Sequence, residues 1–153
     1  MGFMLHMDFT FFNVESIRGF TSTFVAICSA TSYPFVLPSR SKRPPLDILT
    51  FLVTTLRNHD KKVSFIQVDY YGALAKSSEF IKTCHNMSII VQTTGGYAST
   101  INCKNKSTNK TLANNTRALI QKSSHNKQLW CLSSQYAIFL SRQTDNTLRS
   151  EVP

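Results

Sequence analysis

Apolar and polar side chains alternate around Asp8 in residues 4–13 with the period of two that is typical of β-strands. Residues 20–30 are rich in β-branched and aromatic residues, which also favour a strand. Small polar residues and prolines separate the apolar segments, and these residue types favour turns. Pro34 and Pro38 restrict the third segment to a sheet edge or to strand ends, because proline cannot donate a ladder hydrogen bond. We predict three short strands in an antiparallel meander, at residues 4–13, 20–30 and 33–39.

The pattern then alternates between helical and strand periods. Pro44 and Pro45 suit the start of a helix. Its predicted apolar face consists of Leu46, Leu49, Phe51, Leu52, Val53 and Leu56. A strand is expected at 61–69. A second helix follows at 76–87, with Ser77 or Ser78 as its cap.

The run 88–94 is apolar and reads as a buried strand of the kind found in parallel sheets. After a loop at 95–106, two helices are expected at 107–124 and 126–143. The apolar face predicted for the last helix consists of Leu129, Leu132, Tyr136, Ala137 and Leu140. The order β-β-β-α-β-α-β-α-α predicts an α/β fold with a mixed five-stranded sheet flanked by helices.

Composition is that of a globular domain, with 153 residues, 42% hydrophobic residues and 16% charged residues. We expect one domain at 1–145, followed by a truncated tail at 146–153. The 17 Lys+Arg against 8 Asp+Glu give a net charge of +9. Such an excess favours a polyanionic partner, although charge alone is equally compatible with a generic basic surface.

No apolar run reaches the roughly 18 residues that a membrane helix needs. The apolar start of the chain is interrupted by Asp8, Glu15 and Arg18, so it makes a poor signal peptide. The cysteines, Cys28, Cys84, Cys103 and Cys131, lack the spacing of zinc ligands. We therefore expect an intracellular protein, nuclear or cytoplasmic, with no membrane partner and no cofactor held by cysteine.

Four motifs together resemble a known family. They are "HMDF" at 6–9, "VDYYGALAKSSEFIKTC" at 68–84, "TTGGYASTINCKNKSTNKTLANNTRALI" at 93–120 and "LWCLSSQYAIFLSRQ" at 129–143. The chain is similar, over nearly its whole length, to the integrase catalytic core of copia-type (Pseudoviridae) retrotransposons. The resemblance implies a ribonuclease H-like fold and DNA as the partner, both the retroelement ends and the target.

Integrases of this family join DNA ends with Mg2+ or Mn2+ held by three carboxylates, and hard cations of this kind prefer oxygen ligands. By position, the resemblance makes Asp8 and Asp69 the first two carboxylates. Lys106 stands where the family has its third, a catalytic Glu. No acidic residue lies between Glu79 and Asp145, so no neighbour can replace it.

An ammonium group competes with a cation for the same carboxylates. We therefore expect this copy to be catalytically impaired, a pseudoenzyme. Tyr70, Tyr71, Ala73 and Cys103 also depart from the family's residues. A second hypothesis is a non-enzymatic nucleic-acid-binding or structural remnant with no metal site.

Basic residues cluster near the missing carboxylate. Lys104, Lys106, Lys110 and Arg117 are candidates for contacts with DNA phosphates, although such a cluster also fits a solvated face. Trp130 and Tyr136 are expected in the core rather than on a stacking surface. The family generally acts as multimers, so a homo-oligomer is also implied.

Overall fold

A computed structural model of the chain describes residues 3–41, 43–70, 72–94, 103–123 and 126–149, with the backbone alone for 103–106 and 142–149. One mixed sheet has the strand order β3-β2-β1-β4-β5. Its strands are β1 (Phe3–Phe11), β2 (Ser22–Cys28), β3 (Pro34–Ser39), β4 (Val63–Asp69) and β5 (Ile90–Thr94). The first three strands are antiparallel, and β4 and β5 run parallel to β1. This arrangement confirms the predicted meander and mixed sheet.

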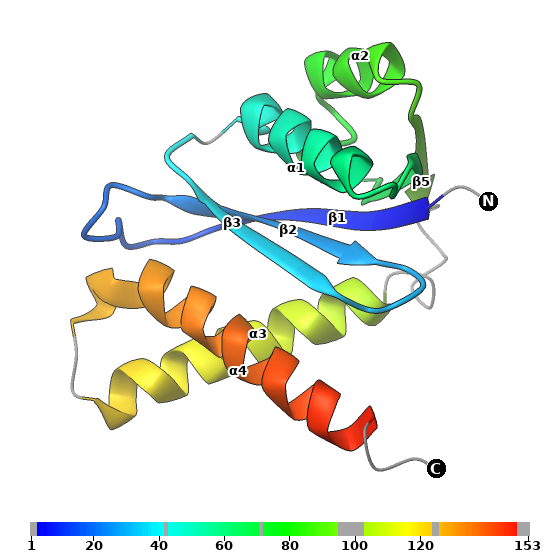
Figure 1. The fold of residues 1–153 in the computed structure, drawn as a ribbon. Helices are drawn as coiled ribbons and strands as arrows, with labels where there is room; N and C mark the ends of the chain where they lie inside the picture. The colour runs from blue at the N-terminus through cyan, green and yellow to red at the C-terminus, as the bar shows by residue number, and fades with distance from the viewer. Residues whose placement is uncertain (1–2, 42, 71, 95–102, 124–125, 150–153) are drawn as a thin grey trace.

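Helices cover both faces of the sheet, as Figure 1 shows. On one face lie α1 (Leu46–Asn58) and α2 (Ser78–Asn86). On the other lie α3 (Cys103–Lys122), the short 3-10 helix η1 (Lys127–Leu129) and α4 (Trp130–Arg149). None of the described helices is long and apolar enough to cross a membrane.

The two faces of the sheet are packed unequally. Leu5, Met7 and Phe9 of β1 belong to a large buried cluster that includes α1 and α2. The opposite cluster is small: Val25, Ile27 and Val36 of the strands meet Ile138 of α4, with Leu112 of α3 beside them. Since burial of apolar area drives such packing, the α1/α2 layer is held more firmly than α3 and α4.

The predicted cap and core residues of α2 are confirmed. Ser77 is the N-cap, and its Oγ accepts a hydrogen bond from the backbone N–H of Phe80 at 3.2 Å. Cys84 lies in the core, and burial raises the pKa of its thiol from 9.0 to about 12. A thiol with so high a pKa is unreactive at neutral pH.

Two predictions about burial were wrong, and the predicted loop is contradicted only at its end. Phe51 is 65% exposed, because the buried face of α1 runs through Leu49, Leu52, Val53 and Leu56 and leaves Phe51 outside it. The run at 88–94 was predicted to be buried, but β5 is an edge strand with most of its residues exposed or half-buried. The predicted loop falls mostly on residues 95–102, outside the described residues, and α3 already begins at Cys103.

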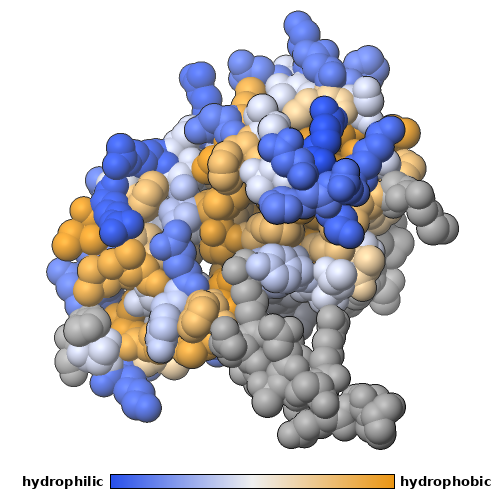
Figure 2. Space-filling model, in the orientation of Figure 1, coloured by the Kyte–Doolittle hydropathy of each residue, from blue (hydrophilic) through white to orange (hydrophobic). Residues whose placement is uncertain are grey.

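The orientation of α4 also differs from the prediction. Leu132, Tyr136 and Leu140 are exposed, whereas Trp130, Cys131, Ser134, Ala137 and Ile138 are buried. Trp130 sets this orientation: its indole N–H donates to the carbonyl of Val14 at 2.8 Å, and its ring stacks on Phe12. Apolar side chains consequently reach the surface on the side of α4 and the β1–β2 hairpin (Figure 2).

The faces of α1 can be tested with two neighbouring substitutions. Leu52→Ala should lower the free energy of unfolding by about 2–5 kcal/mol, because it leaves a cavity in the core. Phe51→Ala should change it by no more than about 0.5 kcal/mol, as exposed positions usually do. Urea denaturation followed by circular dichroism measures both, and equal losses would contradict the observed orientation of α1.

Candidate functional site

The parallel pairing of β1 with β4 brings the two predicted aspartates together. Met7 of β1 is the register partner of Val68 of β4. Asp8 and Asp69 are the next residues on these adjacent strands. Residues in register on neighbouring strands project from the same face of a sheet. The side chains of Asp8 and Asp69 therefore project from the same face, the one that α3 and α4 cover.

Polar residues form a strip on this face of the two central strands. It consists of His6 and Asp8 of β1 and of Gln67 and Asp69 of β4, where His6 and Gln67 are register partners. His6 and Gln67 are buried, and Gln67 Oε1 has no hydrogen-bond partner among the described residues. Buried polar atoms usually find partners, so this strip is unusual for the centre of a sheet.

Both carboxylate oxygens of Asp8 accept a hydrogen bond. Oδ1 accepts from the backbone N–H of Phe9 at 2.8 Å, and Oδ2 accepts from Nδ2 of Asn109 at 2.7 Å. Asn109 belongs to α3, so this hydrogen bond joins the helix to the middle of β1. These two hydrogen bonds fix the orientation of the Asp8 carboxylate.

Asn109 was missed from the sequence alone. It lies one turn after Lys106 on α3, and residues three apart share a side of a helix. A sequence signal therefore existed: the position that follows the third ligand by one turn should also approach the aspartates. The side chain of Lys106 lies outside the described residues, so only its place in the first turns of α3 can be given.

Asp69 ends β4 with its side chain exposed. The backbone N–H of Gly72 donates to the carbonyl of Asp69 at 3.0 Å, which turns the chain sharply after the strand. A Cβ at position 72 would lie 3.1 Å from that carbonyl oxygen, a tight contact that makes a larger residue unfavourable in this turn. Thr94 of β5 is the register partner of Asp69. Tyr71 lies outside the described residues.

The basic residues predicted to contact DNA all lie on α3. Lys110 and Arg117 are exposed, and Arg117 donates a weak hydrogen bond to Oδ1 of Asn114 at 3.5 Å. Lys104 and Lys106 occupy the start of the same helix, with side chains outside the described residues. Of the predicted core aromatics, Trp130 is buried as expected, but Tyr136 is 53% exposed and not in the core.

Two carboxylates suit a magnesium ion, which proteins often bind through one or two carboxylates together with water and substrate phosphates. The site lies between the carboxyl end of β4 and the middle of β1. From these two strands the chain continues to opposite sides of the sheet, from β1 to β2 and from β4 to β5. Open α/β sheets bind ligands at such positions. Within the described residues no group of three or more His, Cys, Asp or Glu side chains could hold a metal ion.

Comparison with known proteins supports the fold. No family model matches the chain, and no curated protein does. Among solved structures, the chain is similar to one in the cryo-EM structure of the simian T-cell lymphotropic virus intasome in complex with PP2A regulatory subunit B56 gamma, with a TM-score of 0.67 and 16% sequence identity. The match covers 89% of this chain and 46% of that chain, so this chain spans about half of the similar protein. The fold is therefore ribonuclease H-like, as predicted.

The hydrogen bond between Asn109 and Asp8 can be measured by a double-mutant cycle. Asn109→Ala should lower the free energy of unfolding by about 1–2 kcal/mol, because a hydrogen bond to a charged group is lost. In an Asp8→Ala background the same substitution should cost less, with a coupling of about 1 kcal/mol. Asn115→Ala, exposed on α3, is the matched control. Purely additive losses would show that the contact does not form.

Proposed function

We propose that the chain is an integrase-like core related to copia-type retrotransposons, which binds DNA and holds a divalent cation between Asp8 and Asp69. One observation carries the proposal: the two acidic side chains lie on adjacent parallel strands, at the position where α/β sheets bind ligands. The sequence motifs and the ribonuclease H-like fold support the same assignment.

A bound Mg2+ or Mn2+ would polarise a phosphoryl oxygen and activate the attacking hydroxyl or water. The residues of this chain would orient the ion. Asn109 and the N–H of Phe9 fix the carboxylate of Asp8, and the turn at Gly72 fixes the backbone of Asp69. A second metal would need another carboxylate, and position 106 supplies a lysine instead.

Lys106 weakens the proposed catalytic activity. Its place on α3 is one turn before Asn109, which already reaches Asp8. An ammonium group near the two aspartates would reduce their affinity for a cation. We therefore propose that strand transfer is impaired in this copy, whereas DNA binding is retained.

A second candidate function is a DNA-binding module without a metal. The hydrogen bonds that Asp8 accepts from Phe9 and Asn109 favour this second function, because these donors stabilise the carboxylate in the absence of a cation. The two functions differ in the effect of Asp69→Asn. This substitution would abolish cation binding in the first function, and in the second it would raise DNA affinity by removing a negative charge.

The net charge of +9 and the row of cations on α3 support contact with the phosphate backbone. Self-association, which the family resemblance implies, is also proposed. The exposed apolar side chains of α4 (Leu132, Tyr136, Phe139 and Leu140) are candidate contacts between two copies, since large exposed apolar patches usually mark interaction sites.

Metal binding can be measured by calorimetry with Mg2+ and Mn2+. We expect weak binding to the native chain, none to Asp69→Asn, and binding about tenfold tighter or more for Lys106→Glu, because the local charge changes by two units. Lys104→Glu makes the same change on the opposite side of α3 and is the matched control.

The same variants should be assayed for metal-dependent nicking or joining of duplex DNA ends. Activity that appears in Lys106→Glu, and not in Lys104→Glu, would support the proposed site. If Lys106→Glu binds no divalent cation, the metal-dependent function is excluded and the DNA-binding module remains.

DNA binding should depend strongly on salt, because counterions are released from neutralised phosphates. Lys110→Gln should weaken binding to all sequences alike and reduce the slope of log K against log [salt] by about 1. Lys82→Gln, on the opposite helical layer, should leave the slope unchanged. Equal slopes for both variants would argue against α3 as the DNA-facing helix.

A further inference from the structure

A cavity of about 590 Å³ separates the sheet from α3 and the start of α4. Its volume lies in the range of small-molecule sites. It adjoins the polar strip at Asn109 and extends to the β1–β2 hairpin, where Phe12 and Trp130 stack with ring centroids 3.9 Å apart. It occupies the weakly packed side of the sheet, so a ligand could enter without disturbing the larger core.

Two polar atoms at the cavity lack hydrogen-bond partners among the described residues. They are Oγ1 of Thr23, on a side chain that is 2% exposed, and Oδ1 of Asn109. The amide of Asn109 is oriented by its hydrogen bond to the carboxylate of Asp8, which can only accept, so Oδ1 is left as an acceptor. A buried polar group without a partner costs about 1–3 kcal/mol. A ligand with an N–H donor and a further polar edge atom would satisfy both.

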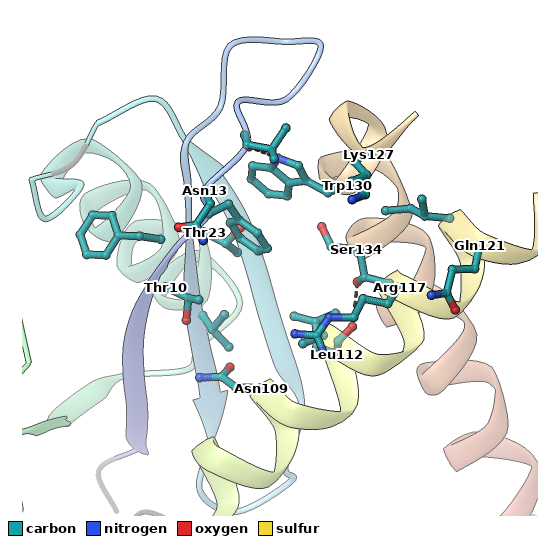
Figure 3. Close-up of a pocket in the computed structure, with 17 residues that line it drawn as sticks. Thr10, Asn13, Thr23, Asn109, Leu112, Arg117, Gln121, Lys127, Trp130 and Ser134 are labelled. Atoms are coloured by element: carbon teal, nitrogen blue, oxygen red, sulfur yellow. Dashed lines mark hydrogen bonds between the residues drawn. The ribbon is translucent and has the colours of Figure 1, made fainter. Parts of the chain in front are cut away.

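The rest of the lining combines apolar residues, neutral polar residues and two cations. Apolar walls come from Val25, Leu112, Ile120 and the aromatic pair, and the charged lining residues are Arg117 and Lys127, with no acid among them. In Figure 3, Lys127 lies beside Trp130, whereas Arg117 reaches from α3 toward the strands nearer Leu112. An apolar slot lined by two cations fits a planar molecule that carries an anionic group.

We propose that this cavity binds an unpaired nucleotide, with the base between the sheet and α3 and its phosphate at Arg117 or Lys127. Bases present N–H donors and acceptors at the edge of a planar apolar body, and they bind on aromatic side chains. The choice of a nucleotide among planar anions rests on the proposed DNA-binding function. Occupancy would also brace α3, and with it Asn109, against β1.

Trp130 provides the measurement, because it is the single tryptophan of the chain and lines the cavity. Its fluorescence is titrated with thymidine 5′-monophosphate in the presence of EDTA, so that no metal is involved. We expect a saturable change. Thymidine should bind about tenfold more weakly, because it lacks the charge-assisted contact, and deoxyribose 5-phosphate should leave the fluorescence unchanged.

Variants locate the ligand. Arg117→Gln should weaken the nucleotide about tenfold and leave thymidine unaffected, with Lys82→Gln as the charge-matched control. Thr23→Val should weaken both ligands several-fold without loss of thermal stability, because the hydroxyl that it removes is buried without a described partner. Unchanged nucleotide affinity in both variants, or no response of Trp130 to millimolar nucleotide, would overturn the proposal.

Two further ligands separate the sources of the nucleotide. A duplex with a single-stranded overhang that binds more tightly than a blunt duplex and than the mononucleotide assigns the cavity to a DNA strand. A mononucleotide that binds at least as tightly as the overhang assigns it to free nucleotides. The titration contains no metal, so its result does not depend on cation binding by Asp8 and Asp69. A fluorescence response of Trp130 would support the nucleotide site even if the aspartates bind no cation. A missing response would not argue against the metal site.

Discussion

The parallel pairing of β1 with β4 is the constraint on which the site depends. It places residues from opposite ends of the first 70 positions in register. The chain then continues from β1 to β2 on one side of the sheet and from β4 to β5 on the other. Asp8 would otherwise be an acid in an apolar strand, and Asp69 an exposed residue before a turn. Pairing makes them neighbours on one face, where Asn109 joins α3 to them.

The two faces of the sheet differ in what covers them. The α1/α2 side contains the continuous apolar cluster and stabilises the fold. The α3/α4 side carries the polar strip, a small apolar cluster and a cavity. A helix that packs loosely on polar residues can respond to what binds beneath it, because little apolar contact opposes its movement. The candidate binding residues on α3 therefore lie on the side of the sheet with the smaller apolar cluster.

Periodicity and turn chemistry sufficed to predict the strands, the helices and the cap at Ser77, because these depend on local physics. Burial was harder to predict. Local patterns assign Phe51, Tyr136 and the residues of β5 to a core. Their exposure depends instead on which neighbouring elements the topology places beside them. The pairing of Asp8 with Asp69 was predicted through the family resemblance, since no local pattern specifies strand order. Asn109 was missed because its only sequence signal is its place one turn after Lys106, and a neutral amide does not otherwise indicate a site.

The most direct test of the central claim is paramagnetic broadening of amide signals by Mn2+ in the isotopically labelled chain. Binding between the two aspartates predicts that the amides of Asp8, Phe9, Asp69 and Tyr70 broaden first, and that Asp69→Asn removes the effect. Broadening that begins elsewhere, or that persists in Asp69→Asn, would contradict a cation site between β1 and β4.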